Sequence, residues 1–233
     1  MLLSIIRQNQ KLAAKRNPAF DRNRFAKFLI YFMVAFWAAY LIFIGVMLSF
    51  AFEDIFPSME PYHIMNQGLI YLLILDFLLR FMLQPAMSQE IKPYLLMPVK
   101  KNKLVDTLLL QSGISSYNFF WFFLIVPFAL LTIIRFYGFT GILCYLCGIW
   151  LLMAMNSYWY LICKTLLNEK LLYILLPIGV YGLLAGTEFI PEGNPVSTFM
   201  MNLGEGFIEG NILAFLGVIA AILLLLLVNR KLQ

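Results

Sequence analysis

The chain has 233 residues, of which 62% are hydrophobic and 12% are charged, and its formal net charge is +5. Soluble domains average about 25% charged residues, and a soluble domain of this length could not bury so much apolar surface. The composition therefore excludes an ordinary soluble domain, and the continuous apolar runs exclude the alternating pattern of an outer-membrane barrel. We expect an all-α membrane protein.

Residues 1–27 are expected to form a cytoplasmic amphipathic helix that lies at the membrane surface. Apolar and basic side chains alternate there at roughly helical spacing, until Asn17-Pro18 breaks the pattern. The segment is not a cleavable signal peptide, because the apolar run after it is too long and no small-residue cleavage site follows.

Six apolar segments follow, and each is expected to be a transmembrane helix. A hydrocarbon core of about 30 Å requires about 20 helical residues. The approximate spans are 28–52, 66–84, 115–134, 137–163, 171–187 and 211–228. Residues 28–233 are thus expected to form one six-helix transmembrane bundle, of which the fifth and sixth helices are the shortest.

The distribution of Lys and Arg orients this bundle, since cytoplasmic loops carry an excess of basic residues. Basic residues gather before the first span, between the second and third, between the fourth and fifth, and after the sixth, whereas the opposite loops hold Arg135. The acids on the opposite side are Glu53, Asp54, Glu60, Glu188, Glu192, Glu205 and Glu209. Both termini are therefore expected in the cytoplasm, and the basic pI near 9.1 needs no nucleic-acid partner.

Asp76 and Arg80 are the ionisable residues placed deep in a span. Their i, i+4 spacing puts them on one helix face, where pairing lowers the cost of burial, which is about 2.5–3.5 kcal/mol for a lone charge at mid-membrane. Two interpretations are open. The residues are a self-neutralised structural pair, or they form a contact that rearranges during a conformational cycle or lines a polar path. Asn156 and Ser157 are the other polar residues expected near the midplane.

Several motifs are interpreted as structural. Cys144 and Cys147 form C-x-x-C, but no nearby His or acid completes a metal site, so we expect small residues inside an apolar helix. His63 is the single histidine and is expected to have no catalytic role. Gly182 and Gly186 form G-x-x-x-G, which lets helices pack closely, either within the bundle or between subunits. The sequence has no phosphate-binding loop, H-E-x-x-H or G-x-S-x-G motif, so we expect no enzyme, metal or cofactor site in this chain.

The water-facing feature that stands out is the basic segment 85–104 between the second and third spans. Within it, Tyr94-Leu95-Leu96-Met97-Pro98-Val99-Lys100-Lys101-Asn102-Lys103-Leu104-Val105 resembles a stretch of the membrane permease subunits of type-2 ABC exporters. The topology is similar as well, because that family has six spans, cytoplasmic termini and an amphipathic helix before the first span.

The resemblance implies a permease subunit of an ATP-driven exporter in a bacterial cytoplasmic (inner) membrane. Residues 1–27 would be its connecting helix, 28–233 its permease domain, 90–101 its coupling helix and 196–210 its outer re-entrant segment. The residues expected to contact the ATPase are Lys92, Tyr94, Leu96, Pro98, Lys100, Lys101 and Lys103. The implied partners are a separate ABC-type ATPase, which holds ATP and magnesium, a second permease copy and membrane lipid.

Three alternatives remain open. The chain could be a haem-export-type membrane subunit, a membrane scaffold that recruits partners through the same basic loop, or an integral membrane enzyme. The aromatic content of 16% favours a lipidic, peptide-like or hydrophobic drug substrate for a transporter. Because the chain ends shortly after the sixth span, a complete half-transporter and a part of a longer permease are both compatible with the sequence.

Overall fold

The protein is all-helical in the computed structural model, which describes residues 24–84, 94, 101–187 and 194–232 and the single residues 4, 6, 8, 9 and 12. No strand occurs among these residues, so the expected all-α fold is confirmed for them. The helices are α3 (Arg24–Ile55), α4 (Pro61–Gln67), α5 (Leu69–Leu83), α7 (Lys101–Gly113), α8 (Phe122–Thr132), α9 (Ile134–Glu169), α10 (Leu175–Gly186), α11 (Pro195–Ile208) and α12 (Ile212–Leu232). Two short 3-10 helices, η2 (Ser116–Phe119) and η3 (Leu171–Ile174), connect them.

Within the described residues, three helices are long and apolar enough to cross a membrane: Lys27–Ile55 of α3, all of α9 and all of α12. Two bent pairs bring the number to five if each counts as one span. The pair α4 and α5 bends by 48°, and the pair formed by residues 101–119 and α8 bends by 59°. Residues 171–186 form a shorter apolar helix at the place of the expected fifth span. The structure thus supports a membrane-embedded protein with three to five candidate spans.

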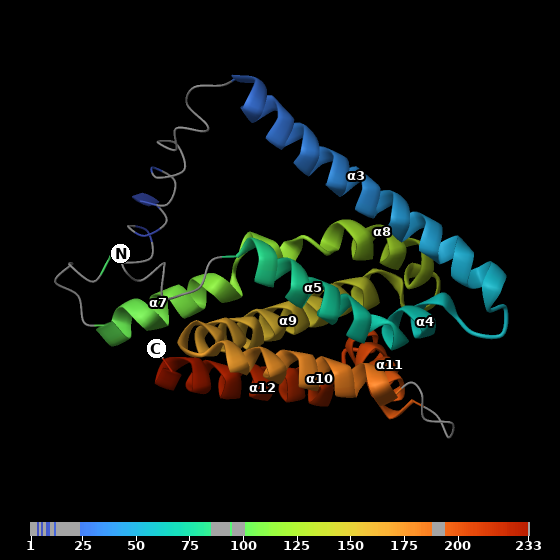
Figure 1. Ribbon diagram of the computed structural model, residues 1–233. Coiled ribbons are helices and arrows are strands. Elements are labelled where there is room, and N and C mark those ends of the chain that lie inside the picture. The colour runs from blue at the N-terminus through green and yellow to red at the C-terminus, as the bar shows by residue number, and fades with distance from the viewer. Residues whose placement is uncertain are drawn as a thin grey trace.

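The contacts show that helices run in parallel groups. Along α3 and α8, Gly45 lies against Leu124 and Phe52 packs on Phe128, so residue numbers rise together. The same holds for α5 and α9, since Asn156 bonds to Leu73 and Tyr160 to Gln84. Figure 1 shows the result: α3, α7 and α8 run one way, and α5, α9 and α12 run the other way.

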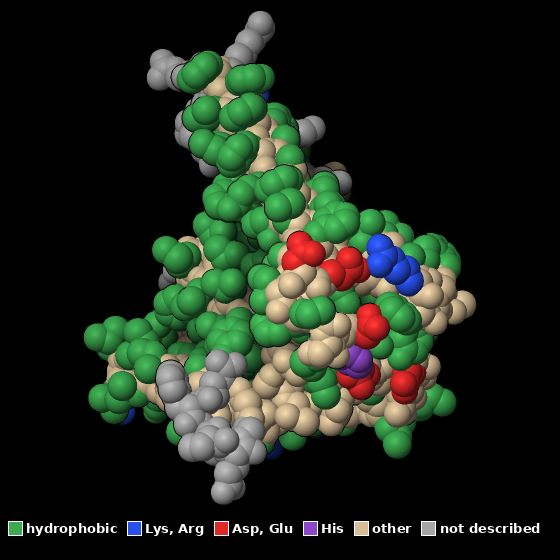
Figure 2. All heavy atoms as spheres, turned by 90° about the vertical axis from the view of Figure 1, so that its right-hand side faces the viewer, with side chains coloured by type: hydrophobic (Ala, Val, Ile, Leu, Met, Phe, Trp, Pro, Cys, Tyr) green, Lys and Arg blue, Asp and Glu red, His purple; other side chains and the backbone are tan. Residues whose placement is uncertain are grey.

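Charges separate to the two ends of this bundle. One end is acidic (Figure 2), and it is formed by α4 and by the C-terminal ends of α3 and α11. It carries Glu53, Asp54, Glu60, Glu205 and Glu209, together with His63 and Arg135. The opposite end, where α7 begins and α9 and α12 finish, carries Lys101, Lys103, Lys164, Lys170, Arg230 and Lys231, with Asp106 paired to Arg230 at 3.3 Å. The segregation is what the distribution of loop charges predicts.

Helix α9 forms the centre of the bundle, since 44% of its apolar window is buried against 11% for α3 and for α12. One hydrophobic cluster joins α9 to α4, α8 and α11, and a close approach occurs where a Cβ at Gly148 would lie 2.2 Å from the Phe207 ring. A second cluster joins α9 to α7; it includes Ile6 from the N-terminal segment, and Tyr94 from the segment between α5 and α7 packs against it.

Candidate functional site

A group of buried polar side chains occupies the interior of the bundle, beside the bend between η2 and α8. We call it the polar hub, and it consists of Asp76, Arg80, Asn118, Trp121, Asn156 and Tyr181. The side chains of Asp76 and Arg80 are 4% and 1% exposed, so both members of this ion pair are buried inside the protein. A charged pair facing a bundle interior is the ordinary position of functional ionisable residues in membrane proteins.

The carboxylate of Asp76 accepts three hydrogen bonds from three parts of the chain. Arg80 Nε donates to Oδ2 at 2.7 Å, as the i, i+4 spacing predicts, and Asn156 Nδ2 donates to the same oxygen at 2.8 Å. Trp121 Nε1 donates to Oδ1 at 2.9 Å. Three donors, from α5, from α9 and from the residue before α8, therefore converge on this one buried carboxylate.

The guanidinium of Arg80 links the hub to the broken span formed by α7, η2 and α8. Its Nη2 donates to Asn118 Oδ1 at 2.8 Å, and Asn118 Nδ2 in turn donates to the main-chain oxygens of Ser112 and Gly113. Those carbonyls belong to the last turn of α7, where helical partners are missing. Asn118 therefore closes the end of α7 and holds Arg80 at once.

One guanidinium nitrogen of Arg80, Nη1, has no hydrogen-bond partner among the residues that the structure describes. Buried donors of native proteins nearly always have a partner, from protein or from ordered water. This N–H group is therefore the place in the hub where an ordered water molecule is expected.

Asn156 connects the hub to the remaining helices. Besides its bond to Asp76, its Nδ2 donates to the main-chain oxygen of Leu73 at 2.9 Å, and its Oδ1 accepts from Tyr181 of α10 at 2.9 Å. The hydroxyls of Ser157 and Ser112 lie 2.9 Å apart and add a bond between α9 and α7. Movement of any one of these helices thus has to stretch or exchange hub hydrogen bonds.

The end of α5, one turn beyond Arg80, is fixed by a second polar arrangement that we call the α5 clamp. Lys164 Nζ donates to the main-chain oxygens of Phe81, at 2.9 Å, and of Gln84, and it lies 5.3 Å from the ring centroids of both Phe81 and Tyr160. Tyr160 donates its hydroxyl to the same Gln84 oxygen at 2.6 Å. A cation beside the last carbonyls of a helix is favourable because of the helix dipole.

The basic segment 85–104 begins directly after Gln84. Of the residues expected to contact an ATPase, Lys101 and Lys103 lie in the first turn of α7 and are exposed, and Tyr94 is half-buried against the second hydrophobic cluster. Lys92, Leu96, Pro98 and Lys100 lie outside the described residues, as do most of residues 1–27. At the far end of the segment, residues 101–104 belong to α7.

The other residues that the sequence pointed to lie apart from the hub. Gly182 and Gly186 lie on α10, and no described atom outside the helix's own backbone would lie within 4 Å of a Cβ at either position. Cys144 and Cys147 are free thiols, and no group of His, Cys, Asp and Glu able to hold a metal occurs among the described residues. His63 Nδ1 contacts Glu205 Oε1 and so joins α4 to α11 at the acidic end.

Several residues of the hub and the clamp were not anticipated from the sequence: Asn118, Trp121, Tyr181, Tyr160 and Lys164. Asn118 could have been noticed as an amide inside an apolar run, next to a pair of serines that weakens the helix. Lys164 is one of the basic residues between the fourth and fifth expected spans, and its capping role depends on α5 and α9 running in parallel.

Comparison with other proteins gives a family but no characterised relative. No curated protein and no solved structure matches this chain. The model of a family of unknown function, DUF5687, matches residues 10–233, and the protein therefore belongs to the DUF5687 family.

Proposed function

We propose that this protein is the membrane-spanning permease subunit of an ATP-driven exporter, coupled to a separate ATPase through the basic segment 85–104. The observation that carries the proposal is that one helix, α5, both contributes the buried ion pair and leads into the basic segment. This helix holds Asp76 and Arg80 in the hub and ends at Gln84, immediately before the basic segment. A partner that pulls on the segment would therefore act on the one helix that carries the buried ion pair.

The α5 clamp supports this coupling. Because Lys164 and Tyr160 tie the last carbonyls of α5 to α9, a displacement of the segment moves both helices instead of fraying the end of α5. In the proposed cycle the two helices shift together, and the hub exchanges partners around Arg80, whose Nη1 has no partner to lose. Discontinuous helices that meet at a polar site are common in membrane transporters.

The separation of charge supports the proposed orientation. Under the positive-inside rule, the end with Lys101, Lys103 and Lys231 faces the cytoplasm, which puts the segment on the side where ATP is found. ATP and magnesium would be bound by the partner, since the sequence carries no phosphate-binding loop. Lysines at the segment would suit an acidic groove on the ATPase and would speed the encounter.

A second permease copy is part of the proposal. Helix α10 presents Gly182 and Gly186 on a surface that nothing in the described chain covers within 4 Å. Small residues four apart allow two helices to approach closely in a membrane, and we assign this face to contact with the second copy. In the proposed mechanism, a pathway between two such copies opens alternately toward each side of the membrane, and this alternation moves the substrate.

The first test is a charge reversal of the basic segment. A variant with Lys100, Lys101 and Lys103 all changed to Glu should still insert and fold in membranes, but it should lose the ATPase that co-purifies with the wild-type chain. The matched control is Lys231→Glu with Lys170→Glu, which changes exposed charge at the same end and should retain the ATPase. Retention of the ATPase by the triple variant would contradict the coupling role.

A second test separates the exporter from a scaffold that recruits partners through the same segment. The double variant Asp76→Asn, Arg80→Gln removes both hub charges and leaves the segment unchanged. For an exporter, the ATPase should stay bound while its ATP turnover in the complex changes, because the step coupled to α5 is altered. Unchanged turnover with unchanged binding would favour the scaffold.

A further inference from the structure

A groove separates the N-terminal half of α3 from η2 and the start of α8. Helices α3 and α8 approach each other closely at Gly45, where a Cβ would lie 2.2 Å from the Leu124 main-chain oxygen. From that point toward its N-terminus, α3 diverges from the bundle (Figure 1). Glycine is needed at position 45, because any side chain there would push the helices apart at the apex of the groove.

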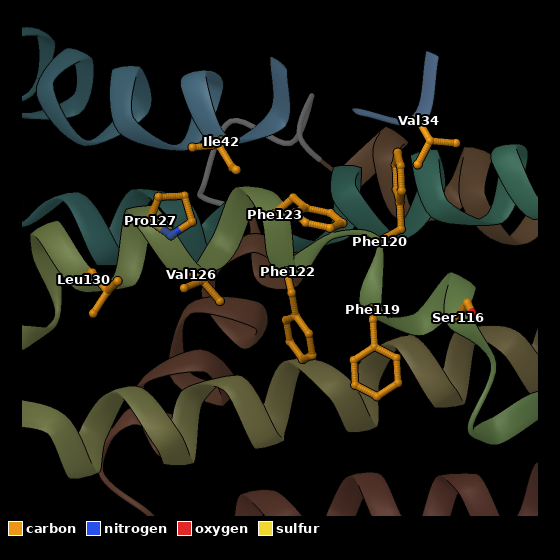
Figure 3. Close-up of a pocket in the computed structure, with 10 residues that line it drawn as sticks. All are labelled: Val34, Ile42, Ser116, Phe119, Phe120, Phe122, Phe123, Val126, Pro127 and Leu130. Atoms are coloured by element: carbon orange, nitrogen blue, oxygen red, sulfur yellow. The ribbon is translucent and has the colours of Figure 1, made fainter. Parts of the chain in front are cut away.

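The walls of the groove are apolar and aromatic. A cavity of about 830 Å³ lies between Val34 and Ile42 of α3 and a row of phenylalanines on η2 and α8. A second cavity of about 330 Å³ shares Val34, Phe120 and Phe123 with it and continues toward Leu29. Figure 3 shows Val34 and Phe120 facing one another across the space. Among the described residues that line the two cavities, the one polar side chain is that of Ser116.

The length of the groove corresponds to one leaflet of a bilayer. From Lys27, just before the groove, to Ile42 at its deep end there are 42 − 27 = 15 helical steps. At 1.5 Å each, they span about 22 Å. Half of a bilayer, including the headgroup region, is about 20–22 Å thick. A molecule that reached from the membrane surface to the midplane would therefore fill the groove from end to end.

The open end of the groove offers a positive charge. Lys27 lies three and seven residues before Ile30 and Val34, which places it on the same face of α3 as the groove lining. It has no ion-pair partner among the described side chains. A basic residue at the membrane surface attracts anionic lipid headgroups, with about 1 kcal/mol per Lys or Arg.

We propose that this groove binds one membrane phospholipid with an anionic headgroup. Its headgroup, which has a net negative charge because no choline or ethanolamine cation offsets the phosphate, pairs with Lys27. One acyl chain lies between Val34 and the rings of Phe120 and Phe123. A helix of a second copy fits the groove less well, because helices are about 10–12 Å wide and the groove narrows to direct contact at Gly45. A flexible acyl chain can follow that taper.

The test uses the full chain purified in a mild detergent and stripped of lipid. Binding of phosphatidylglycerol and of phosphatidylcholine is measured by native mass spectrometry, and melting temperature is followed in parallel. We expect one phosphatidylglycerol per chain. Lys27→Gln should weaken its binding about fivefold, the equivalent of about 1 kcal/mol, and Lys231→Gln should leave it unchanged.

Filling the groove provides an independent variant. Val34 is 62% exposed on α3, so Val34→Trp should be accommodated, and it should abolish binding of the acyl chain. Leu224→Trp, at a position on α12 that is 61% exposed and lines neither cavity, is the matched control and should bind lipid as the wild type does. Equal binding of the two lipids, or binding that Val34→Trp leaves intact, would overturn the proposal. Loss of a dimer in Val34→Trp without any bound lipid would overturn it as well, in favour of a second copy. None of these readouts depends on an ATPase.

Discussion

Replacement of Asp76 by Asn tests whether the polar hub holds the bundle together. The substitution conserves shape and removes the negative charge that compensates Arg80, whose side chain is 1% exposed. It also places an amide N–H group beside donors, because Arg80 Nε and Asn156 Nδ2 both point at the oxygen Oδ2. Both donors would lose this acceptor, and Asn156 would keep its bond to the Leu73 main-chain oxygen.

The magnitude follows from the burial of the pair. Removal of one partner of a buried ion pair typically costs about 3–5 kcal/mol, because the other charge stays buried without compensation. The Asn side chain retains the bond from Trp121 to Oδ1, so we expect the lower end, about 3 kcal/mol. For a chain of this size, that corresponds to a fall in melting temperature of roughly 6–12 °C.

The assay is thermal unfolding of the purified protein in detergent, with two comparisons. Glu53→Gln breaks an ion pair whose side chains are 38% and 57% exposed, and exposed pairs contribute less than about 1 kcal/mol. The double variant Asp76→Asn, Arg80→Gln carries no unpaired charge and should recover part of the loss. An Asp76→Asn melting temperature within about 1 °C of the wild type, or a double variant less stable than the single one, would refute this reasoning.

Three further predictions concern packing, the clamp and topology. Gly148→Ala should lower stability by about 1–3 kcal/mol in the same unfolding assay, because the new Cβ would lie 2.2 Å from the Phe207 ring, whereas Gly217→Ala, with nothing within 4 Å, should be neutral or stabilising by up to about 1 kcal/mol; equal effects would contradict the close approach of α9 and α11. Lys164→Met should increase hydrogen exchange of the last turn of α5, since Phe81 and Gln84 lose a donor to their carbonyls, and Lys170→Met should not; protection that stays at the wild-type level would show that the clamp does not hold α5. A cysteine introduced at Ser197, in a background without Cys144, Cys147 and Cys163, should react with an impermeant reagent from outside the cell; labelling only after permeabilisation would reverse the proposed orientation.

The sequence was most informative where one physical requirement dominates. Apolar runs long enough to cross a membrane predicted helices at the positions of α3, α9 and α12. The prediction is direct because a segment that crosses lipid has to satisfy its own backbone hydrogen bonds, as a continuous helix does. The pair Asp76–Arg80 was predictable from its spacing alone, since both residues belong to one helix.

The bends were not predictable in the same way. The sequence predicts one span at 115–134, whereas the structure has α7 beginning at Lys101 and a 59° bend before α8. The local signal for this break is weak and consists of Ser115, which is extended and caps η2. The break is compensated by tertiary hydrogen bonds from Asn118 to Ser112 and Gly113, which become apparent when the helices are placed together.

The clamp was also beyond reach of the sequence. Lys164 and Gln84 are 80 residues apart, and each is unremarkable in its own segment. Their contact depends on the parallel alignment of α5 and α9, which brings the ends of both helices to one side of the bundle (Figure 1). Loop charges predicted that these ends share a side, but not that they touch.

The measurement that tests the proposed function most directly is native mass spectrometry of the complex that the tagged wild-type chain forms in its own membranes. We expect two copies of this chain together with an ABC-type ATPase in stoichiometric amount, and we expect the ATPase to be released when Lys100, Lys101 and Lys103 are changed to Glu. A chain that is recovered under several mild detergents without any ATPase would contradict the exporter, and the basic segment would then have to bind a different partner.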